Sequence, residues 1–179
     1  MVHPSRSAPY LISKFREWGV IGLDIVKVVN VLGLGRGLSA LKKIFKSQII
    51  CSYTTLLTDE RNPNDEIYQY QDVRTGEYAS VADYLGVIQF GVLANHSFNE
   101  VGNNSIVRLR CHDGVWTAVL VATRDIEKNE SICLDYGEEY WRNIVSNYIL
   151  DPETELIVRQ YLNKMYDEKM ASLNRKRKH

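Results

Sequence analysis

The stretch Leu93-Ala94-Asn95-His96-Ser97 lies near the middle of the chain, directly after an apolar run. Three polar side chains follow one another at a point where buried backbone is expected to end. An isolated triplet of this kind is more typical of a capped turn with a satisfied histidine. The alternative is a site in which Asn95 and His96 hold a polar small molecule at the edge of a core. The sequence on either side has to decide between the two.

Length and composition limit the classes of protein that this chain can represent. Its 179 residues are enough for one domain with a sizeable core. The 22 basic residues balance 22 acidic ones, so the whole-domain positive field of a nucleic-acid binder is not expected. The run Arg175-Lys176-Arg177-Lys178 is the exception. We interpret it as a solvated tail in preference to a nuclear-localisation or nucleic-acid patch.

The cysteines and the apolar runs give an expected compartment. Cys51, Cys111 and Cys133 show no C-x-x-C spacing and cannot all pair with one another. This favours a reducing compartment and argues against zinc held by local cysteines, so no metal is expected. There is no apolar signal core at the N-terminus, and no apolar run approaches the roughly 20 residues that span a bilayer. We expect an intracellular protein without a membrane partner.

Hydrophobic periodicity predicts a mainly β chain with flanking helices. An N-terminal helical extension is expected over residues 1–24, and β-branched runs predict strands from residue 25 onward. Two strands near residues 106–110 and 117–121 are joined by the turn signal Asp113-Gly114. After Gly137 the apolar spacing becomes helical. Asp151-Pro152 then predicts the start of a second helix, with aspartate as its cap.

A glycine cluster follows a predicted strand and resembles a dinucleotide-binding loop. Its sequence is Gly33-Leu34-Gly35-Arg36-Gly37-Leu38. That loop requires G-x-G-x-x-G and a crossover helix after it, whereas the spacing here is G-x-G-x-G. The chain also reaches the next strand, at 49–53, without room for such a helix. A nicotinamide-dependent reductase is therefore disfavoured. The glycines instead let backbone approach a ligand or another strand.

An internal echo supports a mainly β fold. The pattern Ala40-x-x-x-Ile44-x-x-x-Gln48-x-Ile50-Cys51 recurs as Ala122-x-x-x-Ile126-x-x-x-Glu130-x-Ile132-Cys133. Each copy continues to a tyrosine, Tyr53 or Tyr136. Two similar β-turn-β units predict paired small sheets, and chance similarity between two hairpins is the alternative. Two copies do not make a solenoid.

Three motifs now stand in a fixed order: Gly35-Arg36-Gly37-Leu38-x-Ala40, Asn95-His96-Ser97 and Glu130-x-x-x-x-Asp135-Tyr136-Gly137. Together they resemble the motifs of SET-domain protein lysine methyltransferases, over about residues 25–141. The resemblance implies a SET (β-clip) fold of small curved sheets with a variable insert at about 57–90. It also implies that the last motif threads beside the Asn-His segment to form a C-terminal pseudoknot.

The resemblance further implies a function. S-adenosylmethionine would be the methyl donor, and a lysine on a histone tail or another protein would be the acceptor. Tyr136 would be the catalytic tyrosine, with a buried structural tyrosine as the alternative. The residues expected to bind the donor are Gly35, Arg36, Gly37, Asn95 and His96. Those expected to line the lysine channel, with core packing as an equal alternative, are Tyr53, Tyr140 and Trp141.

The sequence also departs from the family pattern. Val92 and Leu93 stand where an Arg-Phe pair is usual, and Asn103 or Asn104 must replace an asparagine that normally follows Ser97 sooner. No cysteine-rich zinc segment follows the last motif. We therefore expect helices at 142–168 to cover the substrate channel, before a basic tail at 169–179 that frays.

The departures leave a second function open. A catalytically weak SET-like domain that serves as a binding or scaffolding module is the alternative to an enzyme. For either function the nucleus is favoured over the cytoplasm. No nucleic-acid partner is expected beyond the basic tail, and the oligomeric state is open.

Overall fold

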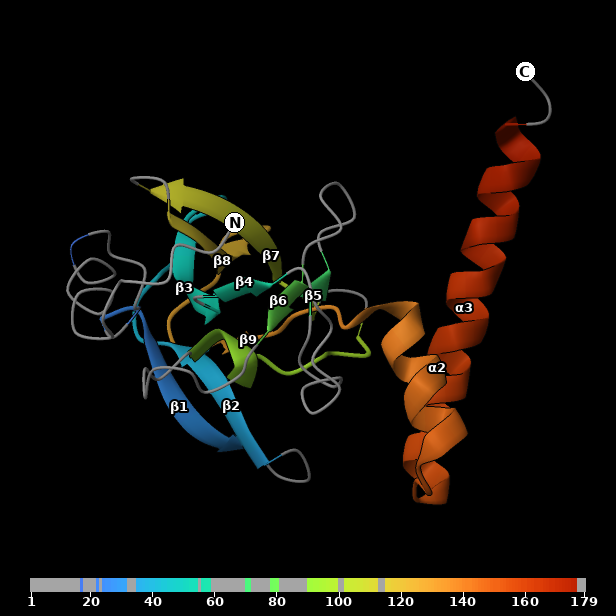
Figure 1. Cartoon of the computed structure of the whole chain (residues 1–179). Coiled ribbons are helices and arrows are strands. Elements are labelled where there is room, and N and C mark those ends of the chain that lie inside the picture. Colours follow the sequence, from blue (N-terminus) through green and yellow to red (C-terminus); the bar gives the residue numbers. More distant parts are fainter. Residues whose placement is uncertain are drawn as a thin grey trace.

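Three small antiparallel sheets, each of three strands, form the body of the molecule (Figure 1). The computed structural model describes residues 17, 22, 24–31, 35–54, 56–58, 70–71, 78–80, 90–99, 102–112 and 115–176. The first sheet has the order β1 (Val26–Val31), β2 (Gly35–Ala40) and β9 (Ser131–Ile132). The second has the order β3 (Ile49–Thr54), β8 (Val115–Ala122) and β7 (Ser105–His112). The third has the order β4 (Leu56–Thr58), β6 (Tyr78–Ser80) and β5 (Tyr70–Gln71).

Strand β8 lies at the centre of the second sheet, between β3 and β7. Every side chain from Thr117 to Ala122 is buried, which explains the unbroken apolar run in this part of the sequence. The predicted hairpin of β7 and β8 is confirmed, because their register runs from Ser105 opposite Ala122 to His112 opposite Val115. The largest fully buried side chains of the core include Leu38, Ile44, Ile50, Leu120, Ile126 and Ile132.

The two copies of the internal echo face each other. Ile44 and Ile126 occupy equivalent positions in the copies and form an antiparallel bridge. Each donates its N–H to the other's carbonyl at 2.9 Å. Beside this bridge the Ala40 N–H donates to the Glu130 carbonyl, also at 2.9 Å. The echo therefore marks two units that pair with one another through a symmetric contact.

The turn of each copy has the same backbone conformation. Ser47 has φ 69° and its counterpart Asn129 has φ 68°, the left-handed region that most side chains avoid. The Ser47 N–H donates to the Ala122 carbonyl, and the Asn129 N–H donates to the Ala40 carbonyl, both at 2.8 Å. Each copy thus uses its turn to reach the strand end of the other copy.

The segment after β9 lies between the two ends of the 95–105 loop. Cys133 forms a parallel bridge with Asn95, and Leu134 forms one with Ser105. The Leu134 N–H donates to the Asn95 carbonyl at 2.8 Å, and the Ser105 N–H donates to the Cys133 carbonyl at 3.0 Å. The predicted pseudoknot, in which the last motif threads beside the Asn-His segment, is confirmed.

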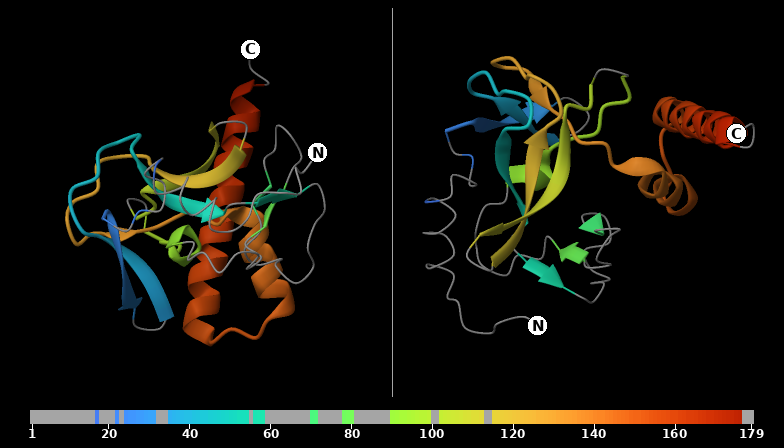
Figure 2. Two further views of the ribbon diagram at one scale, coloured as in Figure 1. Left: turned by 60° about the vertical axis from the view of Figure 1, so that its left-hand side comes forward. Right: turned by 90° about the horizontal axis from the view of Figure 1, so that it is seen from above.

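The described helices are the 3-10 helix η2 (Phe90–Leu93), α2 (Gly137–Asn147) and α3 (Pro152–Lys176). Figure 1 and the right view of Figure 2 show α2 and α3 together on one side of the sheets. The predicted cap at Asp151 is confirmed, because its carboxylate accepts the Thr154 N–H at 3.0 Å. The predicted fraying from Lys169 is wrong, since α3 continues to Lys176. No helix in the described ranges is long and apolar enough to cross a membrane.

Other expectations concern parts of the chain that are described only in places. Of the N-terminal extension at 1–24, Glu17 is helical, and most of the remaining residues lie outside the described ones. Within the variable insert, the sheet of β4, β6 and β5 is described, whereas residues 59–69, 72–77 and 81–89 lie outside.

Candidate functional site

Helix η2 delivers the chain to the Asn-His segment by packing directly on β3. A Cβ atom on Gly91 would lie 2.7 Å from the Ser52 carbonyl and from the Tyr53 Cα, so this contact requires glycine. Val92 and Leu93 are partly buried and pack against the core. The apolar pair that departs from the family pattern therefore serves as packing at the entrance to the site.

Asn95 brings the second motif against the first. Its side-chain nitrogen lies 3.3 Å from the Arg36 carbonyl, to which it donates a hydrogen bond. A Cβ atom on Gly37 would lie 2.8 Å from that same nitrogen, so the missing side chain makes the approach possible. Gly35 has φ 77° and open space around it, and Arg36 is exposed. The structure thus places these three donor-binding candidates at one end of β2, with Asn95 beside them.

His96 is buried, with 2% of its side chain exposed. Its Nδ1 accepts a hydrogen bond from the Tyr136 N–H at 3.3 Å, so Nδ1 carries no proton and Nε2 does. Burial lowers the pKa of His96 below its ordinary value, and the nearby Asp135 carboxylate and a hydrogen bond to the Leu134 backbone oppose this shift only in part. The ring is therefore neutral near pH 7.

Tyr136 connects the last motif to the residue before Asn95. Its hydroxyl donates to the Ala94 carbonyl at 3.0 Å, and its ring packs against the core. The next residue, Gly137, has φ 83° and begins α2, so the chain turns sharply just after the tyrosine. The segment pairing with Asn95 and this turn together fix where the phenol lies.

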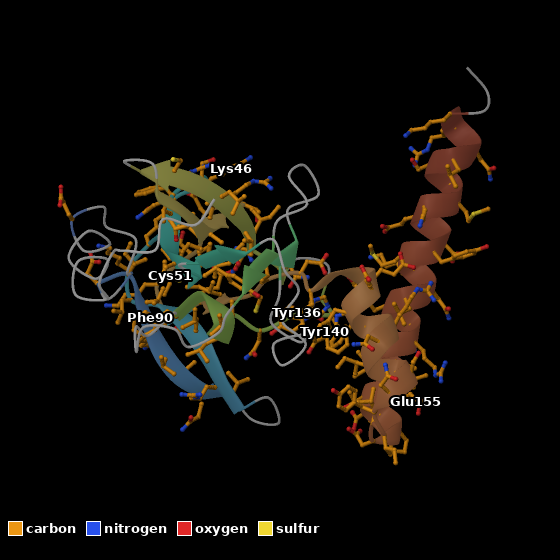
Figure 3. The ribbon with its side chains drawn as sticks, in the orientation of Figure 1. Lys46, Cys51, Phe90, Tyr136, Tyr140 and Glu155 are labelled. Carbon is orange, nitrogen blue, oxygen red and sulfur yellow. The ribbon has the colours of Figure 1, made fainter. Side chains whose placement is uncertain are left out.

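Aromatic rings surround His96 and Tyr136. Figure 3 shows Tyr136 and Tyr140 where the sheets meet α2. Tyr140 and Trp141 of α2 both contact Tyr136, with ring centroids at 4.7 and 5.9 Å. Trp141 also lies 5.1 Å from His96. Tyr161 of α3 lies 5.0 Å from His96. Both C-terminal helices thus contribute rings to the cluster.

Tyr53 has a different position from the other two channel candidates. It lies on β3 with 8% of its surface exposed and belongs to the core cluster against which Tyr136 packs. Tyr140 and Trp141 are half-buried and lie around the Tyr136 ring.

A pocket of about 400 Å³ opens between the loop after Ser97 and helix α3. Its wall combines aromatic and aliphatic groups with amides and charges, a composition common in small-molecule sites. The lining includes Ser97, Phe98, Asn103, Asp135, Tyr161 and Lys164. It adjoins the aromatic cluster through Phe98 and Tyr161, whose ring centroids are 5.8 Å apart.

Two buried donors in the cluster have no hydrogen-bond partner within the described part of the chain. They are His96 Nε2 and Trp141 Nε1. A buried N–H group without a partner costs roughly 1–3 kcal/mol, and such groups often mark a place that a ligand or water completes. With the close approach at Gly37 and the adjoining pocket, these donors fit a polar heteroaromatic ligand such as a nucleoside.

Asn104 holds the threaded segment and was only partly anticipated. Its side-chain nitrogen donates to the Ser131 carbonyl at 2.8 Å, and its side-chain oxygen accepts the Cys133 N–H at 3.0 Å. The neighbouring Asn103 closes the loop instead, accepting the Ser97 N–H at 2.9 Å. Of the two candidates from the sequence, Asn104 is therefore the one that meets the last motif.

Asp135 is a site residue that sequence reasoning missed. One of its oxygens accepts the Tyr161 hydroxyl at 2.8 Å and the Gly137 N–H at 2.9 Å. The same oxygen lies 3.5 Å from His96 Nδ1. Its position directly before Tyr136 in the last motif could have identified it as a site residue. Its contact with Tyr161 on α3 could not be predicted, because no local pattern in the sequence relates the two residues.

Comparison with known proteins identifies the family to which this chain belongs. The family model of the SET domain matches residues 35–137, more than half of the chain. The protein belongs to the SET-domain family, whose methyltransferases use S-adenosylmethionine. This agrees with the arrangement of small sheets and the threaded segment.

Two relatives illustrate the match. The chain is 30% identical over 127 residues to the N-lysine methyltransferase KMT5A-A of Danio rerio, covering 64% of this chain and 36% of that protein. It thus spans about a third of this curated relative. The crystal structure of CpSET8 from Cryptosporidium is similar in fold, with a TM-score of 0.53 and 19% identity over 76% of this chain and 69% of that one.

Proposed function

We propose that this protein is a protein-lysine N-methyltransferase that moves a methyl group from S-adenosylmethionine to a lysine ε-amine. The observation that carries the proposal is the contact of the Tyr136 hydroxyl with the Ala94 carbonyl, next to Asn95. It places a phenol beside the segment that meets the glycines of β2. This is the arrangement expected where a donor and an amine have to be brought together.

The residues that would hold the donor are those gathered at the end of β2. Gly35, Arg36 and Gly37 would present backbone, and the Asn95 amide would bind the polar end of the ligand. His96 Nε2 and Trp141 Nε1 are the buried donors available to a heteroaromatic group. When bound, S-adenosylmethionine supplies an electrophilic methyl group on a sulfonium centre.

Tyr136 would orient the incoming amine. Its hydroxyl donates to the Ala94 carbonyl, which would hold the phenol oxygen in place beside the amine. A lysine reacts as the neutral amine, although its ordinary pKa is about 10.4. The rings of Tyr140 and Trp141 would remove water from around the amine, lowering its pKa and favouring the reactive form.

Helices α2 and α3 would complete the substrate channel. Val158 and Leu162 of α3 are buried, and Tyr161 packs on His96, so α3 is attached to the site itself. Tyr53, buried on β3, would contribute the opposite wall of the channel.

We propose a histone as the substrate class and a nuclear role. The support is the N-lysine methyltransferase activity in the name of the Danio rerio relative.

The experiment is transfer of labelled methyl groups from S-adenosylmethionine to histones, with donor binding measured by calorimetry. Tyr136→Phe should reduce transfer at least about a hundredfold, the scale of lost positioning, while donor binding survives. Tyr148→Phe is the matched control, because Tyr148 follows α2 and is 52% exposed.

Three outcomes distinguish the alternatives. Donor binding without transfer to any protein would favour a binding or scaffolding module. Absence of both donor binding and transfer would remove the proposal. Equal loss of binding and transfer in Tyr136→Phe would make Tyr136 a structural residue.

A further inference from the structure

A single carboxylate oxygen of Asp135 accepts hydrogen bonds from two helices. The Tyr161 hydroxyl donates to Oδ1 from α3 at 2.8 Å, and the Gly137 N–H donates to it from the start of α2 at 2.9 Å. His96 Nδ1 lies 3.5 Å from this oxygen. One carboxylate oxygen therefore joins α3 to both the Asn-His motif and the residue beside Tyr136.

The Nδ1 atom of His96 can serve only one of two partners. In the structure it accepts the Tyr136 N–H at 3.3 Å, which requires the ring to be neutral. A proton on the ring is favoured instead by the Asp135 carboxylate and by a hydrogen bond to the Leu134 backbone. The hydrogen bond that fixes the Tyr136 backbone would then be lost, so the two arrangements exclude one another.

The Tyr161 hydroxyl favours the arrangement in which neutral His96 accepts the Tyr136 N–H. It occupies the Asp135 oxygen that a protonated His96 would need, and a donated hydrogen bond reduces the attraction of the carboxylate for a second donor. Burial and the Asp135 carboxylate raise the pKa of Tyr161, so the phenol keeps its proton and remains a donor.

We propose that Tyr161 is a positioning residue for methyl transfer: its hydroxyl engages Asp135 and thereby leaves His96 as the acceptor for the Tyr136 amide. The inference rests on the proposed function, because it concerns the position of Tyr136. It gives helix α3 a direct role in ordering the reacting tyrosine, through two side chains that both line the pocket.

Other groups around His96 do not provide the same control. Phe98 and Trp141 contact its ring but carry no charge. Glu138 of α2 and Glu168 of α3 act on Tyr161, and both keep its hydroxyl protonated. Lys164 of α3 lines the pocket that Asp135 also lines. The charge that favours a proton on His96 is therefore Asp135.

Tyr161→Phe tests this directly, because it removes the hydroxyl and keeps the ring that packs on His96 and Phe98. In the full-length protein we expect the acid limb of the kcat profile to move to higher pH. On the acid limb itself, kcat should fall by up to about fivefold, the size of one hydrogen bond. The dissociation constant of S-adenosylmethionine at alkaline pH should stay unchanged.

The second readout needs no activity. Titration of ¹³C-labelled histidine by NMR, with the other histidines replaced one at a time for assignment, should give a higher pKa for His96 in Tyr161→Phe than in the wild type. Asp135→Asn should shift the pKa of His96 the opposite way, since it removes the charge. Tyr166→Phe, on an exposed side chain of the same helix, should match the wild type in every measurement.

Unchanged titration of His96 in Tyr161→Phe would overturn the proposal, whatever happens to activity. So would a kcat profile of the variant that overlays the wild-type profile. If the wild type transfers no methyl group, the proposed function fails. The histidine titration would then still decide whether Tyr161 controls the acceptor of the Tyr136 amide.

Discussion

A side chain on Gly37 would collide with Asn95: its Cβ atom would lie 2.8 Å from the asparagine nitrogen. The two residues come from separate motifs, and the contact is what joins β2 to the Asn-His segment. We expect Gly37→Ala to displace Asn95 from the Arg36 carbonyl and to weaken S-adenosylmethionine binding about tenfold, measured by calorimetry, as for the loss of one well-placed polar contact.

The control for this variant is a double-mutant cycle with Asn95→Ala. If the asparagine is the group displaced, Gly37→Ala should cost much less in the Asn95→Ala background than in the wild type. Val31 also lies 2.8 Å from the added Cβ, so a small residual loss is expected. Equal costs in both backgrounds would mean that Asn95 does not need the space.

Asn104 should be critical for stability. It is fully buried, and its amide joins the loop to the Ser131 carbonyl and the Cys133 N–H. Asn104→Ala removes both hydrogen bonds and leaves a cavity at a fully buried position, so the free energy of unfolding should fall by about 3 kcal/mol. Asn147→Ala, on the exposed surface of α2, should change it by less than about 0.5 kcal/mol in the same denaturant titration. Similar losses in the two variants would contradict this role.

Ser47 offers a gain in stability. Its φ of 69° places an L-residue in the left-handed region, and glycine adopts this conformation without the Cβ clash. After the greater freedom of glycine in the unfolded chain is subtracted, Ser47→Gly should raise the free energy of unfolding by about 0.5–1 kcal/mol. Asn129→Gly should gain less, because asparagine tolerates this region and its side chain accepts a hydrogen bond from Lys27. An equal or larger gain at Asn129 would contradict the argument.

The buried neutral His96 predicts a pH dependence of stability. Its pKa in the folded protein lies below the ordinary value of 6.5, chiefly because of burial. Between these two values the unfolded chain binds more protons than the folded one. Stability should therefore be complete above pH 6.5 and fall as the pH is lowered toward the folded pKa, by at most about 1.4 kcal/mol per pH unit.

Denaturant titrations between roughly pH 5 and 8 check this window. His96→Gln keeps a side-chain acceptor for the Tyr136 N–H but cannot titrate, so its stability should depend less on pH over that range. A variant whose stability follows the wild-type pH dependence would show that other groups are responsible.

Much of the fold could be predicted from local patterns in the sequence. The echo of Ala40–Cys51 in Ala122–Cys133 predicted paired units, and the structure joins them through Ile44 and Ile126. Asp151 was readable as a cap because capping depends on neighbours within one turn. The order of the three motifs gave the family and with it the threading of the last one.

Contacts between distant side chains could not be predicted. Tyr161 reads as one more apolar position of a helix, and its bond to Asp135 depends on how α3 lies against the sheets. The sequence likewise could not choose between Asn103 and Asn104, since both stand in one polar loop. The continuation of α3 to Lys176 could not be predicted, because the polar and basic composition from residue 169 onward is typical of a solvated tail.

The placement of residues 131–134 between Asn95 and Ser105 dictates an order of assembly. No nascent chain that ends before Leu134 can contain the finished site, because both ends of the 95–105 loop close on a segment that is synthesised after them. Protection of the Leu134 and Ser105 amides should then be among the latest to appear during refolding. Acquisition of activity would report completion of the whole domain, and a truncated translation product would be inert even if its first sheets had formed.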